Sequence, residues 1–161
     1  MPCMIEAQAY SANTQNRMTY GYLKLNGVIG WQASWHGNFT NNRGANMFLV
    51  DTCYCKLRQW RHFDTSSDSQ AGIGLRDYLM NSVSDGDILV GVSGYEPTRY
   101  LAAAETALSG LGVDVSDVGH RGAWVFVTKK GDTSMTVLDK QLTEEAANAR
   151  QPNINVTLPG T

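Results

Sequence analysis

The sequence predicts an α+β fold in which a mostly antiparallel sheet system carries two helices. Short stretches with strand-like alternation or continuous apolar runs fill most of residues 5–63. Two segments with a helical spacing of apolar residues follow, with strand-like stretches between and after them. This order of strands, helix, strand, helix and strand is typical of α+β proteins.

Turn signals and apolar patterns define the strands. The pair Asn26-Gly27 is a strong hairpin signal. Trp31 and Trp35 fall on one face of a strand, because residues four apart point the same way. Ala45–Asp51 is nearly all apolar, as in a central strand. The predicted strands are Ile5–Ser11, Tyr20–Leu25, Val28–Trp35, Ala45–Asp51, Lys56–Phe63, Ile88–Ser93, the middle of Gly119–Gly131, and Met135–Leu138.

Cap residues and glycines define the two helices. Ser67–Gln70 matches a capping box that opens the first helix, which is expected to end near Ser84. Thr98 is the expected cap of the second helix, and Gly110 and Gly112 end it. The inward-facing residues are Ala71, Leu75, Tyr78, Leu79 and Ser82 in the first helix and Leu101, Ala104, Leu108 and Leu111 in the second.

The end of the chain is less strongly patterned. Leu142–Arg150 has the length of two helical turns, and Pro152–Thr161 has an extended pattern. The last twenty residues are expected to cover a sheet edge, to act as an assembly arm or to be partly mobile. The expected organisation is one globular domain at residues 1–138 with a C-terminal extension at residues 139–161.

Composition excludes two classes of partner. A net charge of −2 and a pI near 5.9 provide no basic field for nucleic acid. No apolar run approaches the roughly 18 residues that a membrane helix requires.

The first residues lack a charged leader and an apolar segment, so a secretory signal is not expected.

The three cysteines are expected to be reduced. Cys53 and Cys55 lie two apart on a predicted strand, where they would share a face with poor geometry for a mutual bridge. A metal site would need further ligands near this pair, and only Cys3 and three dispersed histidines remain. No metal and no cofactor is therefore predicted.

Candidate catalytic groups have simpler structural explanations. Ser93 lacks the glycine pattern of a nucleophile elbow, and no histidine has a partner close in sequence. The aspartates flanking the first helix and the glycine of Asp85-Gly86-Asp87 suit caps and turns. We expect no catalytic residues and a protein that is not an enzyme.

Aromatic residues beside polar residues are the better candidates, because sugars present flat CH faces to rings and hydroxyls to polar groups. Gly119 and Gly122 allow a sharp turn that presents His120 and Arg121 at the mouth of a buried strand. Trp60 and Trp124 are expected to belong to the core. The proposed glycan-binding residues are Arg121, His120, Glu96, Tyr95, Trp35 and Asn38.

Several motifs in a fixed order resemble the ILEI/PANDER domain, also called the GG domain. The resemblance covers roughly Tyr20 to Gly131. The motifs are Leu25-Asn26-Gly27, Arg43–Val50, Phe63-Asp64-Thr65 with the following helix, Ser84–Val92, the second helix to Leu111-Gly112, and Gly119–Gly131. The resemblance implies a compact sandwich of two sheets flanked by helices and a non-enzymatic binding function.

The family includes secreted cytokine-like factors, a glycan-binding stem of an O-mannose N-acetylglucosaminyltransferase and modules of hyaluronan-related proteins, and similar domains occur in bacteriophage tails and fibres. In the glycan-binding stem, an acidic residue after the strand that matches Ile88–Ser93 works with the arginine that matches Arg121. Here Gly94 stands at the acidic position and Glu96 follows two residues later.

Three functions follow as hypotheses. The first is a phage tail or fibre component, placed in the virion, that binds host glycan or decorates the tail through other phage structural proteins. The second is a secreted cytokine-like factor, and the third and weakest is a polysaccharide hydrolase using Asp64, Glu96 or Asp68. A cytoplasmic location and a homo-oligomer stay open.

Overall fold

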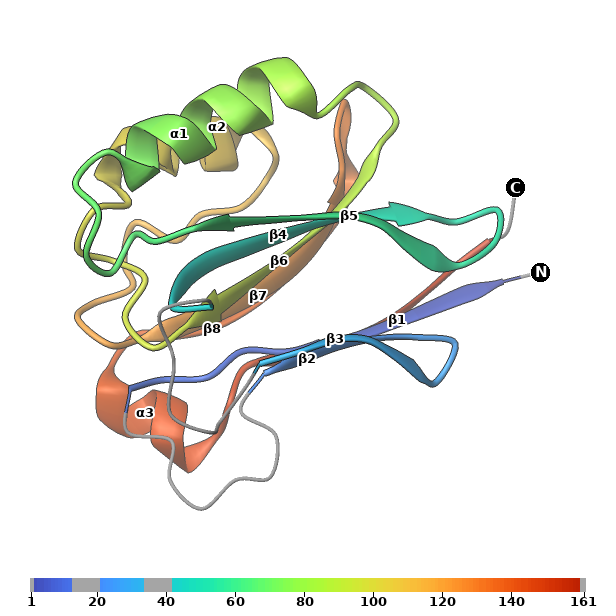
Figure 1. The fold of residues 1–161 in the computed structure, drawn as a ribbon. Coiled ribbons are helices and arrows are strands. Elements are labelled where there is room, and N and C mark those ends of the chain that lie inside the picture. Colours follow the sequence, from blue (N-terminus) through green and yellow to red (C-terminus); the bar gives the residue numbers. More distant parts are fainter. Residues whose placement is uncertain (1, 13–20, 34–41, 160–161) are drawn as a thin grey trace.

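The computed structural model describes residues 2–12, 21–33 and 42–159, and these form three layers. Helices α1 (Ala71–Asp77) and α2 (Glu105–Gly110) cover one face of a five-stranded sheet, and a four-stranded sheet lies against its other face (Figure 1). Both sheets are antiparallel. The predicted α+β class and the two-sheet sandwich are confirmed. Within the described residues, no helix is long and apolar enough to cross a bilayer.

The four-stranded sheet joins the two ends of the chain. Its strands, in the order β3-β2-β1-β9, are β3 (Val28–Gln32), β2 (Tyr22–Leu25), β1 (Cys3–Gln8) and β9 (Asn153–Leu158). Asn26 and Gly27 form the predicted hairpin turn between β2 and β3, and both have positive φ, 49° and 78°. This backbone suits a two-residue hairpin because its twist matches that of the strands.

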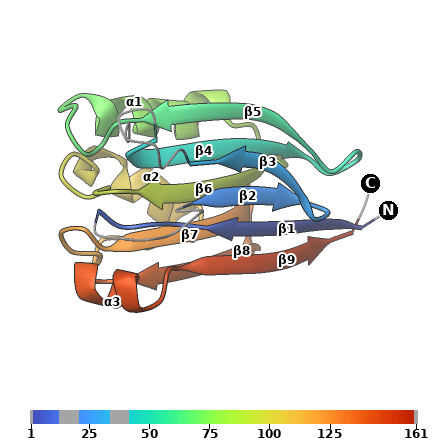
Figure 2. The same cartoon turned by 60° about the horizontal axis from the view of Figure 1, so that its bottom comes forward.

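The five-stranded sheet is the central layer. Its strands, in the order β5-β4-β6-β7-β8, are β5 (Lys56–Phe63), β4 (Gly44–Asp51), β6 (Ile88–Gly94), β7 (Ala123–Lys129) and β8 (Asp132–Gln141) (Figure 2). Strands β4, β6 and β7 are buried on both faces, because one face packs on the helices and the other on the second sheet. The continuous apolar runs of these strands follow from this position.

The helical layer differs from the prediction at its helix starts. α1 continues into a π-helical turn, η2 (Tyr78–Ser82), and a 3-10 turn, η3 (Ala102–Ala104), precedes α2. The expected capping box at Ser67–Gln70 is wrong, because Gln70 precedes α1 without a side-chain cap and the Ser67 hydroxyl donates to Asp64 instead. Ser82, expected to face inward, is exposed, and the core position is taken by Val83. All other predicted inward-facing helix residues are buried.

Residues 139–159 are part of the sandwich. The expected boundary after residue 138 falls inside β8, and helix α3 (Glu144–Ala149) leads from β8 to β9. β9 then pairs antiparallel with β1 from Cys3↔Leu158 to Gln8↔Asn153. This segment therefore covers a sheet edge, one of the three roles expected for it.

Thr143 caps α3 and provides a test of this segment. Its hydroxyl accepts a hydrogen bond from the Ala146 N–H at 3.1 Å. Replacing Thr143 with alanine is expected to lower the free energy of unfolding by about 1 kcal/mol, because a helix N–H loses its partner. Urea denaturation measures the loss, and Thr143→Ser, which keeps the hydroxyl, should retain most of the stability. Equal losses in both variants would contradict a capping role.

The cysteine prediction is wrong. Cys3 and Cys55 form a disulfide with an S–S distance of 2.00 Å, and Cys53 is free and exposed. Cys55 lies on the turn between β4 and β5, not on a strand beside Cys53, and its φ is 51°. The turn brings Cys55 over β1, so the disulfide joins the two sheets. This partner is 52 residues away and leaves no local pattern.

Candidate functional site

Four of the six predicted site residues meet at one end of β6 and β7. These strands are antiparallel neighbours, so the loop after Gly94 and the turn before Ala123 lie together. Tyr95 in the loop and Arg121 in the turn both have left-handed backbone, with φ of 62° and 57°. Such conformations are costly for residues other than glycine and cluster at functional sites.

Glu96 holds the loop and the turn in place. It is only 5% exposed, and its carboxylate accepts hydrogen bonds from the backbone N–H groups of Thr98 (3.1 Å), Arg99 (2.9 Å) and Arg121 (3.0 Å) and from the Thr98 hydroxyl (2.5 Å). Burial opposes ionisation, but these hydrogen bonds outweigh it and lower the pKa of Glu96. Glu96 is therefore an ionised residue that fixes the backbone of Arg121.

Only part of the Arg121 guanidinium is engaged in hydrogen bonds to the described residues. Its Nη1 donates to Glu144 Oε2 in α3 at 3.1 Å, and its buried Nε has no hydrogen-bond partner among the described residues. The Ser11 hydroxyl donates to the Arg121 carbonyl at 2.9 Å, which further holds the turn. A buried N–H without a partner is uncommon in proteins, so Nε is the donor of this guanidinium that the described residues leave unsatisfied.

His120 stands beside Arg121 and is 74% exposed. Its Nδ1 is 3.9 Å from Glu96 Oε1, beyond hydrogen-bonding distance. The imidazole is therefore open to solvent at the edge of the site.

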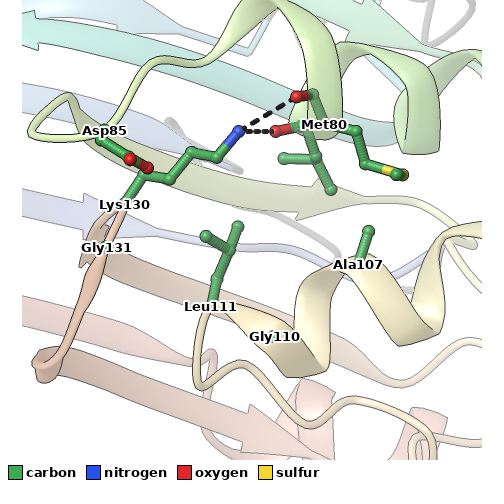
Figure 3. Close-up of a pocket in the computed structure, with 8 residues that line it drawn as sticks. Met80, Asp85, Ala107, Gly110, Leu111, Lys130 and Gly131 are labelled. Atoms are coloured by element: carbon green, nitrogen blue, oxygen red, sulfur yellow. Dashed lines mark hydrogen bonds between the residues drawn. The ribbon is translucent and has the colours of Figure 1, made fainter.

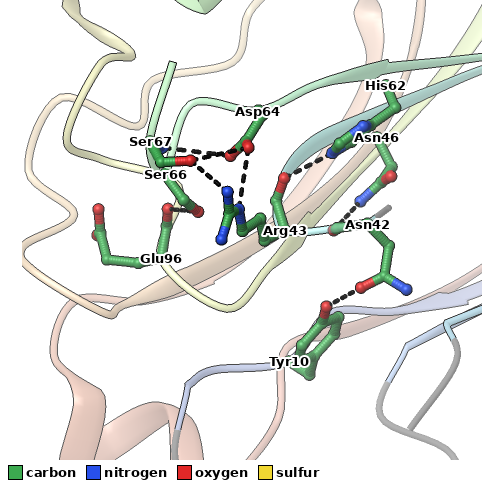
Figure 4. Close-up of polar contacts among 9 residues, drawn as sticks. All are labelled: Tyr10, Asn42, Arg43, Asn46, His62, Asp64, Ser66, Ser67 and Glu96. Atoms are coloured by element: carbon green, nitrogen blue, oxygen red, sulfur yellow. Dashed lines mark hydrogen bonds and ion pairs between the residues drawn. The ribbon is translucent and has the colours of Figure 1, made fainter. Parts of the chain in front are cut away.

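Arg43, Ser66 and Ser67 also line the site, and Figure 4 shows their polar contacts. Arg43 Nε is 2.9 Å from Asp64 Oδ2, and its Nη2 donates to the Ser67 hydroxyl. The Ser66 hydroxyl donates to the Glu96 carbonyl, which ties these residues to the loop. The strand ends β4 and β5 thus supply polar groups beside those of β6 and β7.

These groups surround an open hollow of about 210 Å³, which we name the Arg121 hollow. Its lining residues are Arg43, Ser66, Ser67, Tyr95, Glu96, Arg99, His120 and Arg121. Four of the six predicted glycan-binding residues, Tyr95, Glu96, His120 and Arg121, come together here. The other two, Trp35 and Asn38, lie outside the described residues. Whether any of the six binds a ligand stays a prediction.

Sequence reasoning did not place Arg43, Ser66 or Ser67 in the site. They lie more than 25 residues before Glu96 and reach it only because β4 pairs with β6, with Gly44 opposite Gly94. One signal was present: Gly44, directly after Arg43, has a φ of 98°, and a Cβ there would be 2.6 Å from Phe63 O. The glycine marks a close approach of two chain segments beside Arg43.

The acidic residue expected at position 94 has no room there. A Cβ on Gly94 would lie 2.5 Å from the Asn42 carbonyl oxygen and 2.7 Å from the Tyr10 ring. The hydroxyl of Tyr10 also donates to the Asn42 side chain, so this buried contact is held in place. Two other acidic groups meet Arg121 instead: Glu96 accepts from its backbone N–H, and Glu144 accepts from its guanidinium.

The two tryptophans expected in the core differ in their exposure to solvent. Trp124 is fully buried in the core beneath the helices, as predicted. Trp60 is 42% exposed, because β5 is an edge strand, and its Nε1 donates to Asn46 Oδ1 at 3.3 Å. The prediction for Trp60 is wrong.

A second hollow, of about 370 Å³, lies between the helices and the β7–β8 turn (Figure 3). Lys130 reaches into it, but its ammonium donates to the carbonyls of Leu79 (2.7 Å), Met80 (3.2 Å) and Val83 (2.6 Å). A lysine has three such protons to donate. Lys130 therefore secures the end of the first helix rather than offering a free charge.

Within the described residues, no group of three or more His, Cys, Asp or Glu side chains is arranged to hold a metal ion. Asp64 is engaged with Arg43 and Ser67, and Asp87 accepts from the Ser84 N–H. Both aspartates accept hydrogen bonds from backbone N–H groups of turns, as expected, and Asp64 in addition forms an ion pair with Arg43.

The family model described as Interleukin-like EMT inducer matches residues 43–132, more than half of the chain. The match includes every residue that lines the Arg121 hollow, from Arg43 to Arg121. No curated protein matches the chain.

Proposed function

Because this chain belongs to the interleukin-like EMT inducer family, we propose that it is a non-enzymatic binding domain that holds a glycan in the Arg121 hollow. The family is cytokine-like, and its members are of the secreted type. The observation that supports the site is the pair of left-handed residues, Tyr95 and Arg121, held around the buried carboxylate of Glu96. One hydrogen bond to this carboxylate comes from Arg121, whose left-handed backbone is costly in itself, and the other three hold the loop that follows Tyr95.

The chemistry of the hollow suits a saccharide. Arginine and histidine nitrogens and serine hydroxyls suit sugar hydroxyls, and Tyr95 adds an aromatic ring. Recognition sites of this kind combine apolar or aromatic surface with a few placed polar groups. A glycan array read with the labelled protein is the first test, followed by titration of the best sugar and its effect on the melting temperature.

Arg121→Ala is expected to remove glycan binding and leave the fold intact. The ion pair with Glu144 is partly exposed, so its loss should cost no more than about 1 kcal/mol of stability. Binding should fall at least about tenfold, because the planar donors of the guanidinium are lost. Titration calorimetry measures the binding and thermal melting measures the stability. Arg121→Lys keeps the positive charge but loses the planar set of N–H donors, so this variant should bind the glycan weakly. If Arg121→Ala unfolds the domain, the arginine is structural and the proposed site is wrong.

The disulfide supports an extracellular setting for this function. Disulfides persist in secreted proteins and on virion surfaces, and they are rare in the cytosol. A secreted signalling factor and a phage tail component both meet this condition, and the second also rests on the likeness to phage tail domains. A leader sequence encoded upstream would support the secreted factor. Neighbouring tail genes and immunogold labelling of particles would support the virion component.

A further inference from the structure

Positive and negative charges are placed differently around the Arg121 hollow. Two of its arginines, Arg43 and Arg121, pair with Asp64 and Glu144, and neither of these acids lines the hollow. Among the described residues, the acid that does line it is Glu96, which is only 5% exposed. The charged groups that the lining offers to solvent are therefore mainly cationic.

Arg99 is the arginine of this lining that has no acidic partner among the described residues. It is exposed, and its Cζ lies 5.0 Å from the centre of the Tyr100 ring. A guanidinium over an aromatic face is held by the ring and keeps its N–H donors for other groups.

The segments that the structure does not describe cannot supply an acidic side chain for Arg99. These segments are residues 1, 13–20, 34–41 and 160–161, and their sequence contains no Asp and no Glu. Exposed arginines of the described chain otherwise have acidic partners, as in the pairs Arg58–Asp87 and Arg150–Asp139. Arg99 is therefore a cation for which the chain shows no counter-charge.

Glu96 brings Arg99 and Arg121 close together without pairing with either guanidinium. Its Oε2 accepts from the Arg99 backbone N–H at 2.9 Å, and its Oε1 accepts from the Arg121 backbone N–H at 3.0 Å. Both oxygens of the carboxylate are thus occupied by backbone donors. The acid fixes the backbones of two arginines and leaves the Arg99 guanidinium to a ligand.

We propose that the glycan held in the Arg121 hollow is anionic, with a carboxylate or sulfate group that pairs with the guanidinium of Arg99. This inference rests on the glycan-binding function proposed above and names the class of sugar. Arginine binds such oxyanions through two parallel N–H donors, which gives both energy and orientation. The remaining lining residues contact the uncharged part of the sugar.

Methyl β-glucuronide and methyl β-glucoside are matched probes, because they differ in a carboxylate at C6 in place of a hydroxymethyl group. Titration calorimetry of the whole protein should show at least about tenfold tighter binding of the glucuronide. This preference should shrink as the salt concentration rises, because ions screen an exposed charge pair. Methyl β-glucoside 6-sulfate is the third probe, and the tighter binder of the two charged sugars identifies the anionic group.

Arg99→Gln should abolish the preference by lowering glucuronide binding to the level of the glucoside, while glucoside binding stays unchanged. The fold should persist because the Arg99 side chain is exposed and has no acidic partner in the described chain, and thermal melting checks this. Arg76→Gln is the matched control, since it removes a partly exposed positive charge from α1 outside the hollow. This control should keep the preference.

Three results would overturn the inference and leave the glycan-binding function standing. One is equal binding of the charged and neutral sugars by the parent protein. The second is a preference that survives Arg99→Gln, which would assign the anion to another residue. The third is inorganic sulfate that binds as tightly as the sulfated sugar, which would mean an anion site without sugar recognition. If no sugar binds here or on the glycan array, the proposed function itself is wrong.

Discussion

Replacing Cys3 and Cys55 with alanine is expected to lower the free energy of unfolding by about 4 kcal/mol. The bond closes a loop between residues 52 apart, and a long loop restricts the unfolded chain strongly. Both side chains are buried, so alanine adds no polar group to the core. Because the bond joins β1 to the β4–β5 turn, its loss should first loosen the end of the sandwich where this turn lies.

Urea denaturation of the double variant, with and without reductant, measures this effect. Cys53→Ala is the matched control and should keep the stability of the parent, since Cys53 is exposed and unbonded. Reductant should destabilise the parent protein and the Cys53 variant and leave the double variant unchanged. A double variant as stable as the parent would show that the bond does not support the fold in solution.

The second large effect is expected at Glu96, where Glu96→Gln should cost about 3 kcal/mol of stability. The carboxylate accepts four hydrogen bonds, and a glutamine amide would turn an NH₂ group toward one or more of these donors. Donors left without partners in a buried site are costly. Glycan binding should also fall, because an NH₂ group in place of Oε2 would oppose the Arg99 N–H and disturb the loop that holds the left-handed backbone of Arg121. Urea denaturation and the glycan titration measure the two losses, and a fully stable Glu96→Gln protein would contradict the structural role.

The pH dependence of stability is a separate test of Glu96. Burial by itself would raise the pKa of Glu96. The hydrogen bonds from Thr98, Arg121 and Arg99 lower this pKa by more than burial raises it, so in the folded protein the pKa of Glu96 is below the ordinary 4.5. The stabilisation is therefore fully present above about pH 4.5 and is lost as the pH falls through the folded pKa. The stability difference between the parent and Glu96→Gln should shrink in acid.

Melting temperatures of both proteins between neutral and acidic pH measure this difference. Other carboxylates with lowered pKa values, Asp114 and Asp139, are present in both proteins and cancel in the comparison. A difference that stays constant, or grows in acid, would mean that Glu96 is not ionised in the folded protein.

Part of the candidate site could be predicted because its residues sit at recognisable turns. Glycines on both sides of His120 and Arg121 indicated a sharp bend before a buried strand, and the structure has that bend. The sequence identified Glu96 as a polar residue close to a strand end. It did not show that the Glu96 carboxylate accepts the hydrogen bond that fixes the backbone of Arg121. That role depends on the pairing of β6 with β7, which no local pattern specifies.

The amino-acid sequence by itself determined the local elements. Alternation, apolar runs, the Asn26-Gly27 turn and the helical spacing of Leu101, Ala104 and Leu108 each act over a few residues, so the fold class followed from them. Only the tertiary structure decided the Cys3–Cys55 bond, the exposure of Trp60 and the wall that Arg43 adds to the hollow. These features depend on which strands become neighbours and which become edges. That choice is made by packing between residues far apart in the chain, where no periodicity records it.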